Sequence, residues 1–210
     1  MIEIFGQAFW DERYRSRSEL WSGEPNPHLV SHASELGGGT ALDVGCGEGA
    51  DAVWLAERGW QVTAVDVSPV ALRRGASRAA EAGADVARRI DWLHEDVRTW
   101  GPDPASYDLV SAQFMHLPKE PRETLFRRLA TSVAPGGTLL IVGHHPSDLQ
   151  TTAHRPPMPE IFFTASEVAA SLDPHAWEIV VDATPGRSTT DPGGHTLTIH
   201  DAVLRALRRD

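Results

Sequence analysis

From Thr40 onward, short apolar runs alternate with longer amphipathic ones, and this alternation restricts the fold more than any other feature of the sequence. Short apolar runs bounded by turn residues are typical of buried strands, and the amphipathic runs are typical of crossover helices. The pattern therefore predicts an α/β protein with a parallel sheet. Strands are expected at residues 40–45, 61–68, 90–97, 107–114 and 138–143, and helices at 48–59, 69–83 and 119–137.

The last third of the chain has a different pattern. Residues 144–160 are rich in Pro, Ser and Thr, which predicts a loop, and a helix with a Thr164–Glu167 capping box is expected to follow. Two further strands are expected at 177–184 and 195–207, around a turn-rich segment at 185–194. A tight connection of this kind favours a hairpin over another crossover.

The N-terminal residues, 1 to about 38, read as a helical lead-in that ends at the glycines of "ELGGG". We expect a single domain over residues 1–210, in which residues 1–38 form the lead-in or lid and 39–210 the core. Trp10, Tyr14 and Trp21 could close over a site or could staple a helix to the core, and both alternatives stay open.

The balance of charge excludes several classes of partner. The formal net charge is −10 and no long basic run offsets it, so nucleic acid and anionic membrane surfaces are disfavoured. No apolar stretch of about 18 residues occurs, and a lone cysteine, Cys46, suits a reducing compartment. We expect a cytoplasmic protein, monomeric or homodimeric, that acts on a small molecule.

A glycine-rich segment, "LDVGCGEGAD", joins the first strand to the first crossover helix. Its glycines allow a sharp turn and a close approach to a ligand. The G-x-G-x-G spacing differs from the G-x-G-x-x-G of dinucleotide sites, which disfavours a nicotinamide-dependent reductase. Asp66, which ends the second strand, can accept hydrogen bonds from both hydroxyls of a ribose. Asp96 could receive the exocyclic amine of an adenine or cap a turn.

The ordered set "ALDVGCGEG", "VTAVDVS", "HEDV", "YDLVSAQF" and "APGGTLLIVG" resembles the successive motifs of class I S-adenosylmethionine-dependent methyltransferases over residues 38 to 143. The resemblance implies a Rossmann-like, doubly wound seven-stranded sheet with the order 3-2-1-4-5-7-6 and an antiparallel last strand. The lead-in looks most like that of the tellurite-resistance and thiopurine methyltransferase-like branch. S-adenosyl-L-methionine is the cofactor that the family uses.

The resemblance also implies roles for single residues. The methionine part of the cofactor would be wrapped by four residues of the glycine-rich segment: Asp43, Gly45, Cys46 and Gly47. Asp66 would hold the ribose, and Val67 would pack on the adenine. The adenine would also be flanked by Asp96 and Val97, and Gln113 would lie near the transferred methyl group.

Histidines follow two strands that we expect to be neighbours. His116 comes after the fourth strand, and His144 and His145 come after the fifth. Ligands of such sheets bind at the carboxyl ends of the strands, so these three histidines are the candidate catalytic residues. Adjacent His144 and His145 would point to opposite sides of an extended chain, so no metal site is predicted. His154 is expected on a loop surface.

The predicted reaction is methyl transfer to a small-molecule acceptor by in-line displacement, with a thiol or chalcogen oxyanion slightly preferred because soft anions need little further activation. An oxygen or nitrogen acceptor would call for a histidine base. A cofactor-binding module without catalysis is the alternative from another class. The segment "AQFMHLPKEP" stands after the fourth strand where nucleic-acid amino-methyltransferases carry an Asn-Pro-Pro-Tyr-like motif.

Overall fold

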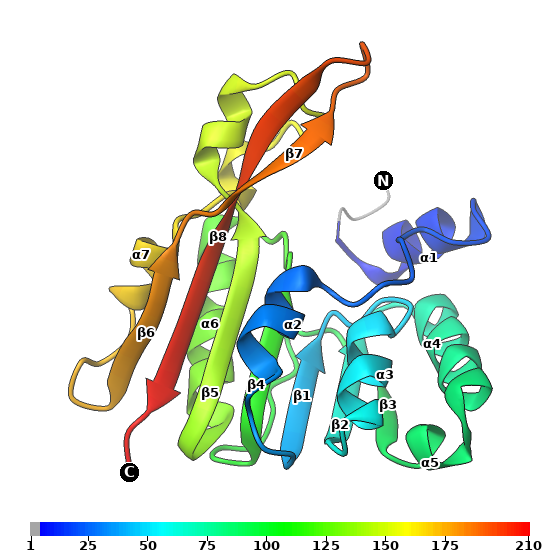
Figure 1. The fold of residues 1–210 in the computed structure, drawn as a ribbon, viewed down its shortest axis with the longest axis vertical. Coiled ribbons are helices and arrows are strands. Elements are labelled where there is room, and N and C mark those ends of the chain that lie inside the picture. The colour runs from blue at the N-terminus through cyan, green and yellow to red at the C-terminus, as the bar shows by residue number, and fades with distance from the viewer. Residues whose placement is uncertain (1–4) are drawn as a thin grey trace.

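The centre of the protein is a twisted sheet, seen in a computed structural model that describes residues 5–210 (Figure 1). The strand order is β3-β2-β1-β4-β5-β8-β6, and β8 runs antiparallel to both β5 and β6. This path is the one that the family resemblance implied, so the predicted fold class is confirmed. The strands on the path are β1 (Thr40–Val44), β2 (Gln61–Asp66), β3 (Ile90–His94), β4 (Tyr107–Gln113), β5 (Val133–His144), β6 (Trp177–Ala183) and β8 (Thr196–Arg208).

An additional strand, β7 (Gly186–Thr190), corrects the prediction of a long turn at residues 185–194. It pairs in antiparallel register with the first part of β8, from Thr196 to His200. A strand forms here because threonine has a high β propensity and because the long β8 offers an edge for pairing. The Pro and Gly residues that suggested a turn lie at the ends of the segment. The true turn is short, with Asp191 N–H bonded to His195 O at 2.9 Å. The β7–β8 ribbon projects beyond the main sheet at the top of Figure 1.

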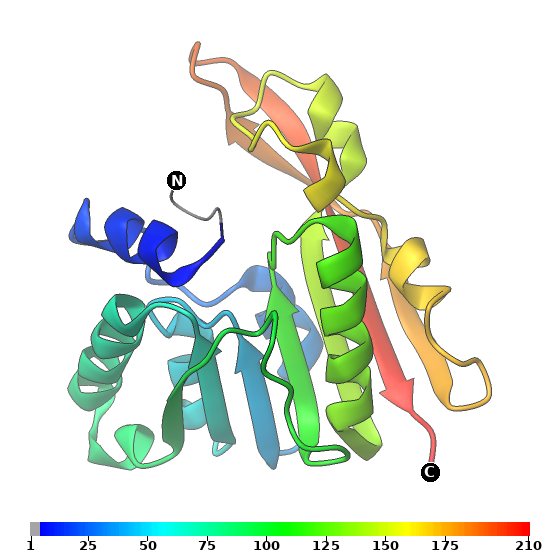
Figure 2. The ribbon, with the colours of Figure 1, turned by 180° about the vertical axis from the view of Figure 1, so that it is seen from behind.

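Helices cover both faces of the sheet (Figures 1 and 2). One face carries α2 (Pro27–Ala33), α3 (Ala50–Glu57), α4 (Pro69–Ala82) and α5 (Ala84–Ala87), and the other carries α6 (Lys119–Ser132) and α7 (Ala165–Ala169). Successive residues of β5 divide between the two cores, since Leu139 and Ile141 pack under α6 while Leu140 and Val142 face α2 and α3. The uninterrupted apolar run in β5 follows from this burial on both faces.

The starts of α4 and α7 carry side-chain caps. Ser68 caps α4 by accepting a hydrogen bond from Ala71 N–H at 3.2 Å, with Pro69 at the first helical position. Thr164 and Glu167 form the predicted capping box of α7. No helix within residues 5–210 has the length and apolar character needed to cross a membrane.

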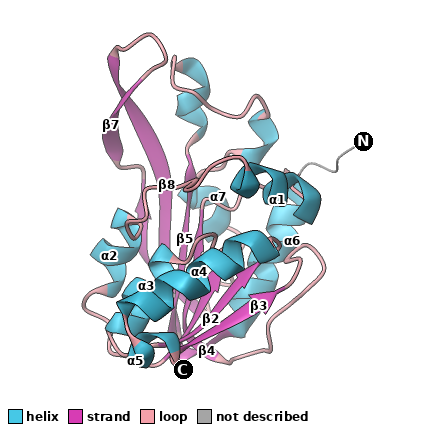
Figure 3. Ribbon diagram, turned by 90° about the vertical axis from the view of Figure 1, so that its right-hand side faces the viewer, coloured by secondary structure: helices cyan, strands magenta, loops and turns pink. Residues whose placement is uncertain are grey.

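Within the lead-in, α1 (Gln7–Arg15) lies across the carboxyl ends of the first strands, beside α4, whereas α2 packs on a face of the sheet (Figure 3). Two short 3₁₀ turns, η1 (Pro146–Gln150) and η2 (Pro159–Ile161), interrupt the predicted loop after β5. The β7–β8 ribbon rises beside this loop (Figures 1 and 2). The lead-in and the loop after β5 thus frame the edge where ligands of an open α/β sheet bind.

Candidate active site

The glycine-rich loop between β1 and α3 has the backbone that its sequence predicted. Gly45, Gly47 and Gly49 have φ values of 69°, 55° and 78°, a region that residues with a Cβ rarely adopt. The N–H groups of Gly45 and Cys46 donate to Val65 O at 2.8 and 3.0 Å. The loop therefore lies against the carboxyl end of β2.

Asp66, at the end of β2, is hydrogen-bonded to this loop. Its Oδ2 accepts a hydrogen bond from Gly47 N–H at 2.9 Å, and its Oδ1 accepts one from Ser68 N–H at 2.8 Å. Burial raises the pKa of Asp66, although these two backbone donors oppose the shift. Each carboxylate oxygen has more than one lone pair, so both can still accept a hydrogen bond from a ligand hydroxyl.

Two further acidic residues lie beneath the loop. Asp43, on β1, is buried, and its Oδ2 has no hydrogen-bond partner within residues 5–210. Burial raises the pKa of Asp43 well above its usual range, and the charges of Asp51 and Asp66 add to the effect. Burial also raises the pKa of Asp51 to about 6, although Asn26 N–H donates to its Oδ1 at 2.6 Å. This concentration of carboxyl groups favours a cationic ligand.

We expect Asp51→Asn to stabilise the ligand-free protein at neutral pH. The pKa of about 6 is above the ordinary value of 3.8, so the native state holds this proton more tightly than the unfolded chain. Stability from this group is complete below about pH 4 and is lost as the pH rises through 6. The variant should gain about 1–3 kcal/mol at pH 7.5 and nothing at pH 4 in urea unfolding. The exposed Asp91→Asn is the control, and a gain that does not vary with pH would contradict the prediction.

The adenine-flanking candidates follow the next two strands. Asp96 accepts a hydrogen bond from Arg98 N–H at 3.0 Å and pairs with the Arg98 guanidinium at 2.6 Å. The hydrogen bonds from Arg98 lower the pKa of Asp96. Asp96 is thus a turn cap in this structure, and its contact with adenine stays a prediction. Val97 is buried in the core, and Val67 is half-buried directly after β2.

Aromatic residues of the lead-in contact the glycine-rich loop. The Tyr14 hydroxyl lies 3.0 Å from the position that a Cβ on Gly47 would occupy, and the Trp21 indole lies 3.4 Å from it. Trp21 Nε1–H donates to Tyr14 Oη at 3.1 Å. Burial, together with the charge of Asp66, raises the pKa of Tyr14 well above its usual range, so the hydroxyl stays protonated. Trp10 packs against Tyr14 with ring centroids 6.2 Å apart.

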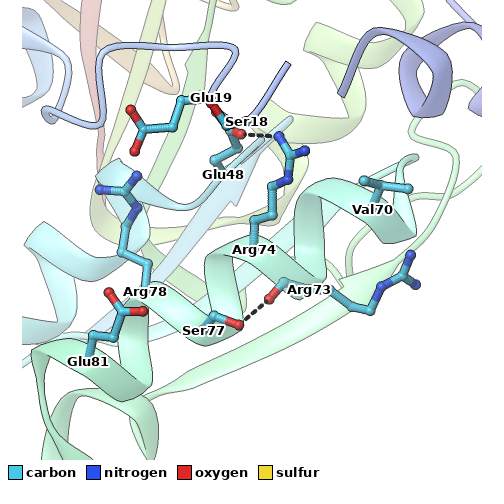
Figure 4. Close-up of a pocket in the computed structure, with 9 residues that line it drawn as sticks. All are labelled: Ser18, Glu19, Glu48, Val70, Arg73, Arg74, Ser77, Arg78 and Glu81. Atoms are coloured by element: carbon cyan, nitrogen blue, oxygen red, sulfur yellow. Dashed lines mark hydrogen bonds and ion pairs between the residues drawn. The ribbon is translucent and has the colours of Figure 1, made fainter. Parts of the chain in front are cut away.

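A set of ionic and backbone contacts holds the lead-in against α4 (Figure 4). Glu48 Oε2 accepts hydrogen bonds from the N–H groups of Leu20 and Trp21 at 3.1 and 3.2 Å. Arg74 donates to Glu48 Oε1 at 2.7 Å and to Tyr14 O at 2.7 Å. The surrounding groove has a volume of about 450 Å³. It is lined by residues of the lead-in, of the glycine-rich loop and of α4, and no residue at the carboxyl ends of β4 and β5 lines it.

The first two candidate histidines form a stacked pair. The rings of His116 and His144 have centroids 4.6 Å apart and planes 21° apart. Phe114 lies 4.7 Å from His144 by ring centroid and has a φ of 55°, which is uncommon for a residue with a Cβ and occurs most often at functional sites. Since β4 and β5 are paired, the predicted proximity of these two histidines is confirmed.

Both imidazoles of this pair are uncharged near neutral pH. Burial lowers the pKa of His116 to about 3, with smaller contributions from the charges of His144 and Arg155. Burial also lowers the pKa of His144, although the neighbouring Asp201 opposes the shift. A neutral imidazole can accept a proton, so either ring is in the form that a base requires. A catalytic role for each stays a prediction.

His145 lies apart from this pair. Its Nδ1 is 2.9 Å from Ser147 Oγ, and its ring is 6.5 Å from that of His200 by centroid. The chain is extended at His145, so its side chain points away from that of His144, as the sequence predicted. His154 is exposed on the loop. Within residues 5–210, no three potential metal ligands converge on a common point.

Two residues near the site, Met115 and Asp201, were missed by sequence reasoning. The Met115 thioether lies 2.3 Å from the position of a Cβ on Gly45, so it packs directly on the loop. Gln113, a sequence candidate, donates to Ser111 Oγ at 2.9 Å and leaves its Oε1 buried without a partner in the described chain. Asp201, on β8, faces His144. No local sequence signal distinguishes Asp201, because strand pairing alone brings it to the site.

A largely parallel sheet with a G-x-G-x-G loop beside an acidic residue at the end of β2 is typical of Rossmann-like proteins that bind nucleotide ligands. A family model described as a methyltransferase domain matches residues 41–137. Residues 41–137 therefore match a methyltransferase domain, in agreement with the resemblance to class I S-adenosylmethionine-dependent methyltransferases found in the sequence.

A methyltransferase of Mycobacterium tuberculosis, described as uncharacterized, is 42% identical over 116 residues. These residues are 54% of this chain and 55% of the relative, so the match spans about half the length of each protein. The similarity therefore identifies the shared domain.

Two solved structures show the same fold at low sequence identity. TehB from Haemophilus influenzae superimposes with a TM-score of 0.68 at 18% identity, covering 97% of this chain and 67% of that one. A Burkholderia thailandensis 1,6-didemethyltoxoflavin-N1-methyltransferase, solved with its substrate and S-adenosylhomocysteine, gives a TM-score of 0.67 at 20% identity, covering 97% and 87%. The likeness to the tellurite-resistance branch is thus one of fold.

Proposed function

We propose that this protein transfers a methyl group from S-adenosyl-L-methionine to a small-molecule acceptor. The proposal rests on the buried carboxyl groups of Asp43 and Asp66, which lie next to the glycine-rich loop. Asp43 Oδ2 is buried without a partner within residues 5–210, which is costly unless a ligand donor completes it. The ammonium group of the methionine part would supply that donor, and Asp66 would receive the ribose hydroxyls. Bound in this way, the cofactor supplies an electrophilic methyl group.

The acceptor is proposed to lie at the carboxyl ends of β4 and β5, beside Gln113 and the His116–His144 pair. A thiol or chalcogen oxyanion remains slightly preferred, because such a nucleophile needs alignment and exclusion of water more than it needs a base. An oxygen or nitrogen acceptor is the second candidate. It is favoured by the uncharged His144 ring, whose carboxylate neighbour would stabilise a proton taken up from the acceptor.

The lead-in would cover the cofactor. Tyr14 and Trp21 already contact Gly47, and aromatic faces attract a sulfonium cation. We further propose that residues 1–210 act as one domain in the cytoplasm, as a monomer or homodimer. The net charge of −10 supports a small-molecule acceptor over nucleic acid.

The proposal is tested in two steps on the full chain. Calorimetry with S-adenosylhomocysteine should show one-to-one binding. Methyl release from labelled S-adenosylmethionine is then measured with thiols, selenite, tellurite, phenols and amines, and at least one class should yield methylated product. Absence of binding would contradict the proposal. Tight binding with no product from any class would favour the alternative, a cofactor-binding module without catalysis.

A further inference from the structure

The carboxylate of Asp201 faces the buried nitrogen of His144. The two residues are directly opposite each other in the antiparallel pairing of β8 with β5. Residues in this relation project from the same face of a sheet. His144 Nδ1 lies 3.9 Å from Asp201 Oδ1, and this nitrogen is buried with no hydrogen-bond partner among residues 5–210. Asp201 thus places a carboxylate beside a buried ring nitrogen that has no hydrogen-bond partner in the described chain.

Asp201 is held as a fixed negative charge. Its side chain is 1% exposed, and its Oδ2 accepts hydrogen bonds from Arg187 Nε at 2.7 Å and, in the matching tautomer, from His28 Nε2 at 3.1 Å. Arg187 also donates to Oδ1 at 3.3 Å. Burial opposes ionisation of Asp201, but its contacts with His144, His28 and Arg187 outweigh burial and keep its pKa far below the usual range, so the carboxylate is ionised near neutral pH.

The other nitrogen of His144 is available to a ligand. No residue in the described part of the chain is hydrogen-bonded to Nε2 of His144, and the side chain keeps 14% of its surface exposed. On its other side the ring stacks on His116, which burial keeps neutral. His144 can therefore take up a proton without a second positive charge in the stacked ring.

We propose that Asp201 is a positioning residue that holds His144 with its proton on Nδ1, so that Nε2 faces the acceptor as the base of methyl transfer. The inference rests on the proposed function and deepens it, because it restricts the acceptor to small molecules with a removable O–H, N–H or S–H proton. In the step, the acceptor atom bonds to the methyl carbon as the carbon–sulfur bond breaks, with its electron pair staying on sulfur. His144 Nε2 takes the acceptor's proton, and Asp201 stabilises the imidazolium that results.

The charge environment of His144 comes from every element packed around it. The groups concerned are His116 after β4, Arg155 in the loop after β5, Arg187 on β7, Asp201 on β8 and, through Asp201, His28 on α2. Among these, Asp201 is the group that favours the protonated ring, while Arg155 and Arg187 disfavour it. Removal of the Asp201 charge should therefore lower the pKa of His144.

The test is nitrogen-15 NMR of the histidine rings in the full-length protein, with His144 assigned from the missing signals of His144→Gln. At pH 7.5 the wild-type ring should show Nδ1 in the N–H form and Nε2 without a proton. In Asp201→Asn the ring should shift toward a mixture of tautomers, and its pKa should fall. Asp148→Asn is the matched control, since Asp148 is equally buried and also holds an arginine, Arg155, but lies beside His200. This control should leave the tautomer of His144 unchanged.

A wild-type ring with its proton on Nε2 would overturn the inference, and so would an unchanged tautomer in a folded Asp201→Asn. If that variant does not fold, the wild-type spectrum decides alone. Calorimetry with S-adenosylhomocysteine on the same samples separates the two proposals. Wild-type protein that fails to bind overturns the proposed function, whereas binding together with the wrong tautomer overturns only the role of Asp201.

Discussion

Asp66→Asn is expected to weaken S-adenosylhomocysteine binding by about 100-fold or more. A hydrogen bond to a charged group contributes about 1.5–3 kcal/mol, and two ribose hydroxyls would donate to this carboxylate. Each 1.4 kcal/mol corresponds to a tenfold change in affinity. In the wild-type protein, Gly47 N–H and Ser68 N–H each donate to one carboxylate oxygen of Asp66. In the variant, the amide NH₂ group replaces one of these oxygens, so one backbone donor would face another donor. The loop should therefore loosen as the ligand contact is lost, and calorimetry measures the result.

Asp91→Asn is the control for this experiment. Asp91 is exposed on β3 and has no predicted contact with the cofactor, so the effect on affinity should be within a fewfold. Thermal unfolding of both variants checks that each is folded at the temperature of the titration. Unchanged affinity in a folded Asp66→Asn would contradict the placement of the ribose at Asp66.

Gly49→Ala is expected to be the most destabilising single-methyl change in the loop, at about 2–5 kcal/mol. An alanine at a φ of 78° carries a backbone penalty of about 1–2 kcal/mol. Its Cβ would also lie 2.4 Å from the Trp92 ring and 3.0 Å from Gly75 Cα. Relief of such overpacking in a rigid core typically costs about a further 1–3 kcal/mol. Urea unfolding without ligand measures the difference in free energy of unfolding.

Gly59→Ala isolates the backbone contribution. Gly59 has a φ of 90°, and an added Cβ there would meet nothing within 4 Å among the described residues. It should therefore lose only about 1–2 kcal/mol. Equal losses in the two variants would show that Trp92 and Gly75 can move aside, and that the packing beneath α3 is looser than the structure indicates.

The fold was predictable because its main signals are local. Strands such as β1 and β2 are short apolar runs, and helices such as α4 carry their own start signal in Ser68 and Pro69. The strand β7 was not predictable in this way. Its sequence pattern is typical of a turn. The segment forms a strand because it pairs with the first part of β8, and this pairing is a tertiary contact.

The cofactor half of the candidate site was also accessible from the sequence. Gly45, Gly47 and Asp66 follow directly from the ends of β1 and β2, and parallel strands bring such ends together without further information. The contact of Tyr14 and Trp21 with this loop was left open, because it depends on how the lead-in packs. The ion pair between Arg74 and Glu48 holds that packing, and neither residue carries a signal for it in the sequence.

The amino-acid sequence by itself determined the class of fold, the glycine-rich loop and the two strand ends that carry His116 and His144. Each of these depends on residue spacing within one element, where backbone geometry is periodic. Only the tertiary structure decided that Asp201 faces His144. That contact depends on the register of β8 against β5, strands that are far apart in the sequence, and a shift of one residue would turn Asp201 to the other face of the sheet.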